Sequence, residues 1–238
     1  MSKIALLAAL FLAAVILPAV EARGQVGYED TFDSYATGSL IAGQRGWETW
    51  DNNPAFNTIV TDAQSLTPPN ALLLAGPADV LQQFTDVAGP WDLFLKVYIP
   101  STQTGEVWVR LANTYAPGGP YNFSVRMVMC VSACTTPGAV PGFAVNIGGS
   151  EVPATGSAPL VTDQWVQVWV VINSTPKFGY QYTLFYNGQN LGTFPWGVTA
   201  PPSVEAIDFF SNNSSPSYMD NFLLAPFVPV ELMSFTVG

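Results

Sequence analysis

Short segments in which apolar and polar residues alternate recur along most of the chain, separated by Gly, Pro, Asn and Ser. Residues 165–172 are the clearest example, because alternate positions place four apolar residues on one side of an extended chain: Val166, Val168, Val170 and Ile172. Helical periodicity is almost absent after residue 22. The pattern therefore predicts an all-β protein built as an antiparallel sandwich or barrel.

Eleven segments have the pattern and the flanking turn residues that a strand requires. They span residues 56–60, 71–74, 80–84, 91–99, 106–113, 121–130, 143–147, 165–172, 180–186, 207–210 and 218–224. Asn187-Gly188 follows one of these strands, and this dipeptide accepts the positive φ values of a two-residue turn. We therefore expect a β-hairpin there.

Alternation also assigns the two faces of each strand. In residues 106–113 three apolar residues face the core, namely Val107, Val109 and Leu111, so Trp108 and Arg110 face outward. In residues 121–130 the same rule predicts an inward face made of Tyr121, Phe123, Val125, Met127 and Met129. It places Asn122, Ser124 and Arg126 on the outer face of that strand.

The N-terminus has the three parts of a secretory signal peptide. Lys3 supplies a positive charge, residues 4–17 are apolar, and residues 20–22 have the small-x-small form of a cleavage site. An apolar stretch of this length is shorter than the roughly 20 residues that cross a bilayer. We therefore expect cleavage after Ala22, export to the extracellular side or cell surface, and no membrane span in the mature protein.

Composition narrows the classes of function. Removal of residues 1–22 leaves six basic and sixteen acidic residues, so the mature net charge is −10, as in the full chain. This charge disfavours nucleic acids and anionic membranes as partners. Charged residues make up only 10% of the chain, but an aromatic content of 13% indicates a folded core. We expect one β-domain over residues 23–226, followed by a tail over residues 227–238.

Cys130 and Cys134 are the only cysteines, and the chain has no histidine. In an oxidising compartment this pair predicts a local disulfide, and a zinc site would need further ligands. The lack of histidine also excludes Ser-His-Asp and Cys-His catalysis. A glycosidase needs only two carboxylates about 5 to 10 Å apart, so that class stays open. The densest acidic group is Glu29, Asp30 and Asp33.

Several motifs resemble concanavalin A-like and laminin-G-like jelly rolls. They are Tyr-Glu-Asp-Thr-Phe-Asp-Ser-Tyr-Ala-Thr-Gly-Ser-Leu at 28–40, Gly46-Trp47, Trp165-Val-Gln-Val, Tyr186-Asn-Gly and Met219-Asp-Asn-Phe-Leu-Leu. The resemblance implies an all-β, two-sheet antiparallel jelly-roll sandwich of a secreted bacterial protein, with a face or loop edge used for glycans. The outward residues that suit this use are Tyr98, Trp108, Arg110, Arg126 and Trp169. The same aromatic and arginine residues could instead be covered by a loop or solvated.

Such jelly rolls sometimes hold a structural calcium ion between their first and last strands. The matching acids here are Asp33 and Asp220, which the fold would bring together. The alternative is that each carboxylate caps a turn by accepting backbone N–H groups.

These observations support three hypotheses. The first is a secreted, non-catalytic carbohydrate-binding module with lectin-like properties, whose partner is a glycan or cell-surface polymer. The second is a structural or adhesive surface protein, and the third is a polysaccharide lyase or glycosidase. Residues 228–234 also resemble the Pro-Val-Glu-Leu-x-Ser-Phe stretch that opens C-terminal sorting regions in some bacterial surface proteins.

Overall fold

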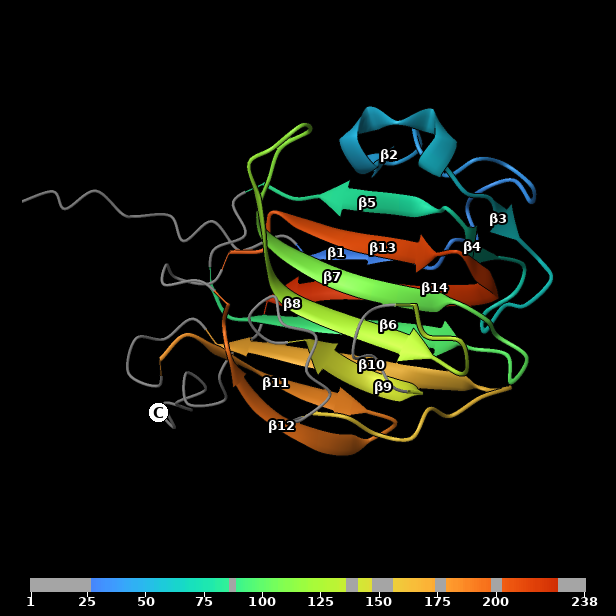
Figure 1. The fold of residues 1–238 in the computed structure, drawn as a ribbon. Coiled ribbons are helices and arrows are strands. Elements are labelled where there is room, and N and C mark those ends of the chain that lie inside the picture. The colour runs from blue at the N-terminus through green and yellow to red at the C-terminus, as the bar shows by residue number, and fades with distance from the viewer. Residues whose placement is uncertain are drawn as a thin grey trace, which may run out of the picture.

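Two antiparallel sheets packed face to face form the molecule (Figure 1). The structure is a computed structural model, and it describes residues 27–85, 89–135, 141–146, 156–173, 179–197 and 203–226. The expected signal peptide over residues 1–22 and the tail over residues 227–238 lie outside the described residues. No helix in the described part of the chain is long and apolar enough to cross a membrane.

The six-stranded sheet faces the viewer in Figure 1. Its strands, in spatial order, are β2 (Trp47–Thr49), β5 (Asp79–Gln83), β13 (Ala206–Asn212), β7 (Glu106–Tyr115), β8 (Tyr121–Cys130) and β9 (Gly142–Asn146). All neighbours are antiparallel. Strands from the beginning, middle and end of the chain therefore alternate in one sheet.

The eight-stranded sheet lies behind the first one. Its order is β12 (Gln189–Pro195), β11 (Gln181–Tyr186), β10 (Trp165–Asn173), β6 (Trp91–Tyr98), β14 (Ser214–Pro226), β4 (Ala71–Gly76) and β3 (Val60–Thr61). Strand β1 (Tyr28–Asp30) also pairs with β14, so the first and last strands lie side by side. Two 3₁₀ turns, η1 (Trp50–Asn52) and η2 (Pro54–Phe56), follow β2.

The predicted all-β class and two-sheet jelly-roll sandwich are confirmed. Ten of the eleven predicted strands coincide with observed strands to within a few residues, whereas β1, β2 and β12 were not predicted. The predicted hairpin joins β11 and β12, and Asn187 and Gly188 have the expected positive φ values of 50° and 75°. The expected strand over residues 56–60 is wrong for most of its length. Asn53 accepts a hydrogen bond from Ala55 N and initiates η2, which ends at Phe56, and only Val60 belongs to a strand, β3.

The core lies between the sheets and matches the alternation of most strands. Val166, Val168, Val170 and Ile172 of β10 are all buried, as are the three inward residues predicted for β7. A satellite cluster outside this core contains Leu81, Ala112 and Ala206, with Trp50 packed against it. Those small and medium side chains lie on the outer face of the six-stranded sheet, where Trp50 covers them.

Strand β8 departs from simple alternation because of a β-bulge. Leu111 pairs with Val125, but the next residue of β7, Ala112, pairs with Phe123, so Ser124 is an extra residue in β8. A bulge residue exchanges the faces of all residues on one side of it. Tyr121 and Phe123 consequently lie on the outer face, and the prediction that they face the core is wrong.

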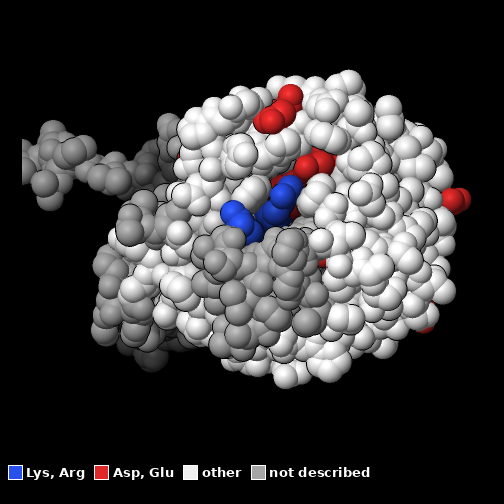
Figure 2. All heavy atoms as spheres, viewed as in Figure 1, with Lys and Arg blue, Asp and Glu red and all other residues white. Residues whose placement is uncertain are grey.

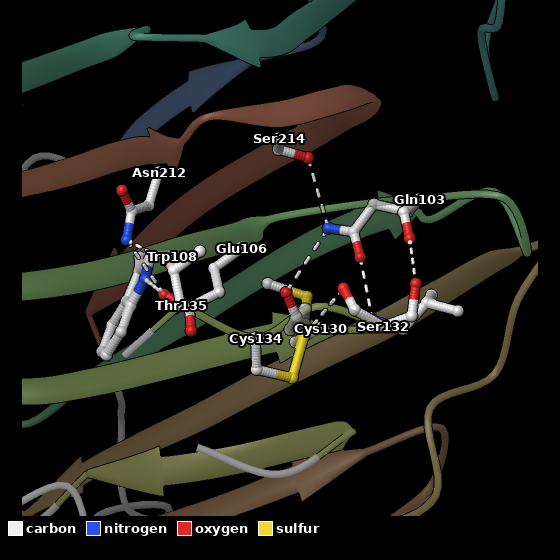
Figure 3. Close-up of a disulfide and its surroundings, with 11 residues drawn as sticks. Gln103, Glu106, Trp108, Cys130, Ser132, Cys134, Thr135, Asn212 and Ser214 are labelled. Carbon is white, nitrogen blue, oxygen red and sulfur yellow. Dashed lines mark hydrogen bonds between the residues drawn. A yellow bond between two sulfur atoms is a disulfide. The ribbon is translucent and has the colours of Figure 1, made fainter. Parts of the chain in front are cut away.

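The predicted disulfide between Cys130 and Cys134 is present (Figure 3). It closes a turn at the end of β8, which is held by the buried Gln103 of the β6–β7 connection. Gln103 accepts a hydrogen bond from Val131 N at 2.9 Å, and its backbone oxygen accepts one from the Ser132 hydroxyl at 3.2 Å. The disulfide turn is thereby fixed against the end of the sandwich.

Candidate functional site

The five residues predicted to bind carbohydrate lie on two opposite surfaces. Trp108 and Arg110 on β7 and Arg126 on β8 lie on the outer face of the six-stranded sheet. Tyr98 on β6 and Trp169 on β10 lie on the outer face of the eight-stranded sheet. The expectation of one shared surface is therefore wrong. Alternation tells whether a side chain faces away from the core, but it does not tell to which sheet its strand belongs.

The aromatic residues on the outer face of the eight-stranded sheet pack against one another. Trp169 is stacked between Phe94 at 5.4 Å and Phe185 at 4.4 Å, and its indole N–H donates to Asp92 at 2.8 Å. Tyr98 contacts Trp165 at a tilt and Tyr218 edge to face, with centroids 5.6 and 6.1 Å away. A pyranose stacks on a free ring face, and both faces of Trp169 are covered. The Trp169 ring is therefore not free to stack on a sugar. A small cavity of about 280 Å³ on this surface is lined by Gln167, Trp169, Phe185 and Gly188.

The outer face of the six-stranded sheet carries a row of five residues, four of them charged, that runs straight across five strands. Each member is the direct partner of the next, and we call this set the arginine row: Glu48, Leu81, Asp208, Arg110 and Arg126. Figure 2 shows the basic side chains of this face gathered in a hollow, with acidic side chains beside them.

Arg110 is the centre of the row. Its Nε donates to Asp208 Oδ2, and its Nη2 lies 3.4 Å from Asp79 Oδ1. The guanidinium also lies over three rings, with its Cζ 4.6 Å from the Phe210 centroid, 4.7 Å from the Phe123 centroid and 5.4 Å from the Trp50 centroid. Cation–π contacts of this kind orient the planar group as well as stabilising it. The Arg110 side chain keeps 16% exposure, so it reaches the floor of the hollow.

Asp79 and Asp208 form a coupled acid pair beneath Arg110. Burial, and then the charge of Asp208, raise the pKa of Asp79 to about 9. Asp208 Oδ1 is buried and receives no N–H donor from the described residues. A proton retained on Asp79 supplies the missing donor, because the two side chains are within hydrogen-bonding reach. At neutral pH Asp79 therefore retains its proton beside the ion pair of Arg110 and Asp208.

Arg126 is the direct cross-strand partner of Arg110. Its guanidinium lies 5.3 Å from the centroid of Phe123, so that one ring contacts both arginines. Two like charges in opposite positions of an antiparallel pair repel each other. Phe123 lies on the outer face only because of the Ser124 bulge. The bulge therefore brings the Phe123 ring into contact with both arginines.

One side of the hollow is a group of four rings, which we call the aromatic cluster: Trp50, Tyr115, Tyr121 and Phe123. Trp50 contacts the other three at centroid distances of 4.9 to 5.6 Å. Tyr121 keeps 53% of its surface exposed, so part of its ring is free to meet a ligand. Sequence reasoning missed this cluster. The alternation around Ser124 gives no signal of a bulge, whereas a tryptophan followed by Asp-Asn-Asn-Pro is a recognisable sign of an exposed loop aromatic.

Trp50 is held over the sheet by a strained turn. Asp51 and Asn52 both have positive φ values, 52° and 57°, which non-glycine residues adopt rarely. Asp51 N donates to the Tyr115 hydroxyl at 3.1 Å, and Asp51 Oδ1 accepts from Gly118 N at 2.8 Å. These bonds tie η1 to the β7–β8 connection and give the aromatic cluster a fixed position.

The opposite end of the face is closed by the disulfide region, which Figure 3 shows. Trp108 is nearly buried there, and its indole N–H donates to Glu106 Oε2 at 3.2 Å. Asn212 donates to the same carboxylate at 3.2 Å and to the Thr135 hydroxyl at 2.7 Å. Trp108 is therefore part of a packed wall, and its ring is not open to a ligand.

The acids near the N-terminus have structural partners. Asp30 is buried and accepts hydrogen bonds from the Tyr35 hydroxyl, from Trp47 Nε1 at 2.9 Å and from Phe32 N at 2.9 Å. Arg45 lies 3.5 Å from the same carboxylate. This network anchors β1 and β2, so the densest acidic group of the sequence does not form a pair of catalytic carboxylates on the sheet face.

The predicted calcium pair lies close together but is bonded to the backbone. Asp220 Oδ2 accepts from Leu66 N at 2.8 Å and from Thr67 N at 3.1 Å, and Asp33 Oδ1 accepts from Asn70 N at 3.3 Å. Burial, and to a smaller extent the charge of Asp33, raise the pKa of Asp220. Within the described ranges, no three acidic, cysteine or histidine side chains are grouped as metal ligands. Turn capping is thus observed, and calcium binding stays a prediction.

No protein family matches the chain, and no curated protein matches it at a significant level. Solved structures do match. A sialidase is similar with a TM-score of 0.56 and 12% identity, over 85% of this chain and 19% of that protein. Alginate lyase Aly36B has a TM-score of 0.53 and 14% identity, over 84% of this chain and 97% of the lyase. The Emp46p carbohydrate recognition domain has a TM-score of 0.52 and 9% identity, over 84% of this chain and 96% of that domain.

These similarities concern the fold. The chain spans about a fifth of the sialidase and nearly the full length of the other two proteins. At such low identities, a shared jelly-roll sandwich does not carry residue roles from one protein to another. A sialidase, a lyase and a carbohydrate recognition domain all have this architecture, so the function of this chain must be argued from its own surface.

Proposed function

We propose that this chain is a secreted, non-catalytic carbohydrate-binding module that holds its ligand on the outer face of the six-stranded sheet. One observation carries the proposal: the arginine row and the exposed Tyr121 of the aromatic cluster meet in one hollow of this face. Aromatic rings stack on the apolar faces of pyranoses, and guanidinium groups donate paired hydrogen bonds to sugar oxygens. Carbohydrate-active and carbohydrate-recognising proteins with the same fold support the proposal.

The disulfide supports export, because such bonds persist in oxidising compartments. The segment expected to direct export is the apolar stretch over residues 4–17, which ends before the first described strand. A glycan or cell-surface polymer would be met in the same compartment.

A catalytic role is less well supported. The acid pair that the described residues place in the hollow, Asp79 and Asp208, lies under Arg110 with side-chain exposures of 10% and 1%. Neither group is therefore placed to exchange protons with a bound glycoside. The Tyr115 hydroxyl accepts the Asp51 N–H, and burial raises its pKa, which makes it a poor base. A lyase or glycosidase would therefore need groups other than these.

Binding to immobilised polysaccharides tests the proposal, with bound protein measured after washing. We expect wild-type protein to bind at least one polymer, Tyr121→Ala to lose most of that binding, and Tyr98→Ala on the opposite sheet to retain it. Both substitutions remove one partly exposed tyrosine ring, so they are matched. Loss of binding in Tyr98→Ala with retention in Tyr121→Ala would place the ligand on the wrong face for this proposal. Product release from the bound polymer would indicate an enzyme instead.

A further inference from the structure

The outer edge of the six-stranded sheet, at β2, borders a cavity with several polar groups in its walls. Figure 1 shows the turns η1 and η2 standing over β2 at this edge. The cavity has a volume of about 420 Å³, and it lies between the loop that ends at Gly46, strand β2 and the turns that run from Asn52 to Asn57. We call it the edge cavity. Its volume falls in the range of about 300 to 1,000 Å³ that small-molecule sites have.

The backbone of β2 presents a donor and an acceptor to the edge cavity. Trp47 N donates to Gln44 O at 2.9 Å, and Trp47 O accepts from Gly43 N at 2.8 Å, so these groups point away from β5. Residues two apart in a strand direct their N–H and C=O groups to the same side. Those of Thr49 therefore also point to the outer edge, where Thr49 lines the cavity. The described residues supply no partner for either group beyond the sheet.

Asn57 joins the two walls of the edge cavity. Its Oδ1 accepts from Ala42 N at 3.1 Å and from Thr58 N at 2.9 Å. These bonds fix the orientation of the amide and leave Nδ2 as the group that Asn57 can offer to a ligand. No acceptor for this Nδ2 is present in the part of the chain that the structure describes. Because Asn57 ties the loop before β2 to the end of η2, the cavity is formed before a ligand enters, which lowers the cost of binding.

Glu48 gives the edge cavity its charge. It is the outermost member of the arginine row and also lines the cavity, and its Oε2 accepts from Gln83 Nε2 at 2.7 Å. Among the described residues that line the cavity none is basic. A carboxylate accepts hydroxyl hydrogens and repels anions. On the other wall lies Asn52, an exposed residue whose amide both donates and accepts.

We propose that the edge cavity binds one neutral sugar unit through its hydroxyl groups. Each hydroxyl both donates and accepts, which matches the mixture of groups on these walls. Hydroxyls donate to the Glu48 carboxylate and to Thr49 O, and they accept from Asn57 Nδ2 and Thr49 N. The inference goes beyond the proposed function, because it assigns a second site at the sheet edge and excludes acidic sugars from it.

The test observes the two amides that the site contributes, by two-dimensional ¹H–¹⁵N NMR of the whole mature chain. The probes are the methyl β-glycosides of glucose, galactose and mannose at up to about 0.1 M, a concentration that reveals weak binding. We expect at least one of them to shift the Thr49 backbone amide and the Asn57 side-chain amide in a saturable way. The uronate that corresponds to that hexose should bind about fivefold more weakly, because its charge meets Glu48.

Variants assign these effects to the edge cavity. Glu48→Gln keeps the shape and removes the charge, so the difference between the hexoside and its uronate should disappear. Asn52→Ala should weaken binding of the hexoside about fivefold through the loss of one hydrogen bond. Asn213→Ala is the matched control, since Asn213 is also an exposed asparagine with a positive φ, 52° against 57° for Asn52. No change in affinity is expected there. Thermal unfolding followed by circular dichroism confirms that each variant is folded.

The outcomes separate this site from the proposed function. If none of the three hexosides shifts both amides, the edge site is overturned, and polysaccharide binding that depends on Tyr121 would still stand. Equal or tighter binding of the uronate by wild-type protein would overturn the neutral class. An equal loss of affinity in Asn52→Ala and Asn213→Ala would overturn the assignment to this cavity. Saturable shifts at Thr49 and Asn57, together with polysaccharide binding that is unchanged in Tyr121→Ala, would support the edge site and contradict the proposed face.

Discussion

At the scale of single residues, the centre of the outer face of the six-stranded sheet is a network of largely buried charged side chains around Arg110. Arg110 is held by Asp208 and Asp79 and by the rings of Phe123 and Phe210, so its position is determined from several sides. Removing one partner of such a network exposes an uncompensated charge, whereas exchanging an acid for its amide preserves the shape. The Asp79 carboxyl is the most informative member, because its proton is what allows two acids to share one arginine.

We expect Asp79→Asn to reduce the pH dependence of stability. Burial beside Asp208 raises the pKa of Asp79 to about 9 in the folded protein from its ordinary value of 3.8, so between these values the folded state retains a proton that the unfolded state has lost. Stability from this group is therefore fully present below about pH 4 and is lost as the pH rises toward about 9. Asparagine cannot ionise, and its amide N–H can donate to Asp208. The melting temperature of Asp79→Asn minus that of wild type should thus increase from pH 5 to pH 9.

Thermal unfolding followed by circular dichroism at several pH values measures this difference. Asp62→Asn, which changes an exposed acid, is the control and should give a difference that does not vary with pH. The interpretation of a shared proton would be abandoned if the Asp79→Asn difference were also constant.

At the scale of elements, the alternation of apolar and polar residues predicts most strands. It does not predict most of the candidate site. The apolar face of β10 and the turn at Asn187-Gly188 were predicted because each depends on local chemistry. Strands β1 and β2 are three residues long, which is too short for a periodic signal. The outward position of Tyr121 and Phe123 depends on the register of β8 against β7, in which Ser124 is an extra residue. In the sequence, Ser124 looks like any other polar residue of an alternating run.

The connection into β7 offers a test of tight packing between elements. Gly105 has a φ of +73°, and a Cβ there would lie 2.6 Å from Asn213 O and 2.8 Å from Asn212 O. Gly118, in the β7–β8 connection, has a similar φ of +75° with nothing within 4 Å of the same position. Gly118→Ala should therefore cost only the backbone penalty of about 1 kcal/mol. Gly105→Ala adds a clash with the backbone and should cost about 3 kcal/mol or more.

Urea unfolding of both variants measures the two free energies. The expected ranking rests on the close approach of the Asn212-Asn213 turn to Gly105. Equal losses of unfolding free energy in the two alanine variants would mean that this turn moves away freely.

At the scale of the whole molecule, the two outer faces have different characters. The eight-stranded sheet presents rings that are stacked on each other, and the six-stranded sheet presents a hollow with an arginine pair and a partly exposed tyrosine. Sequence alternation recognised outward residues on both sheets but placed Tyr121 and Phe123 toward the core. Sorting the outward residues between the two faces required knowing which strands are neighbours. The comparisons with solved structures give the same two-sheet fold and leave the choice of face to the side chains.

The described surface predicts a monomer. The oligomeric state distinguishes a binding module from a structural or adhesive protein, because the latter would assemble with other copies. Large exposed apolar side chains in the described part of the chain are limited to Leu40, Leu66 and Tyr121, and a net charge of −10 opposes self-association. Light scattering coupled to size-exclusion chromatography should therefore give the mass of one chain over a hundredfold range of concentration. The mass should stay the same at about 0.05 M and about 1 M salt, since screening removes repulsion without creating an apolar patch. A mass that rises with concentration at high salt would favour the adhesive alternative, because assembly through apolar contacts strengthens when charge repulsion is screened.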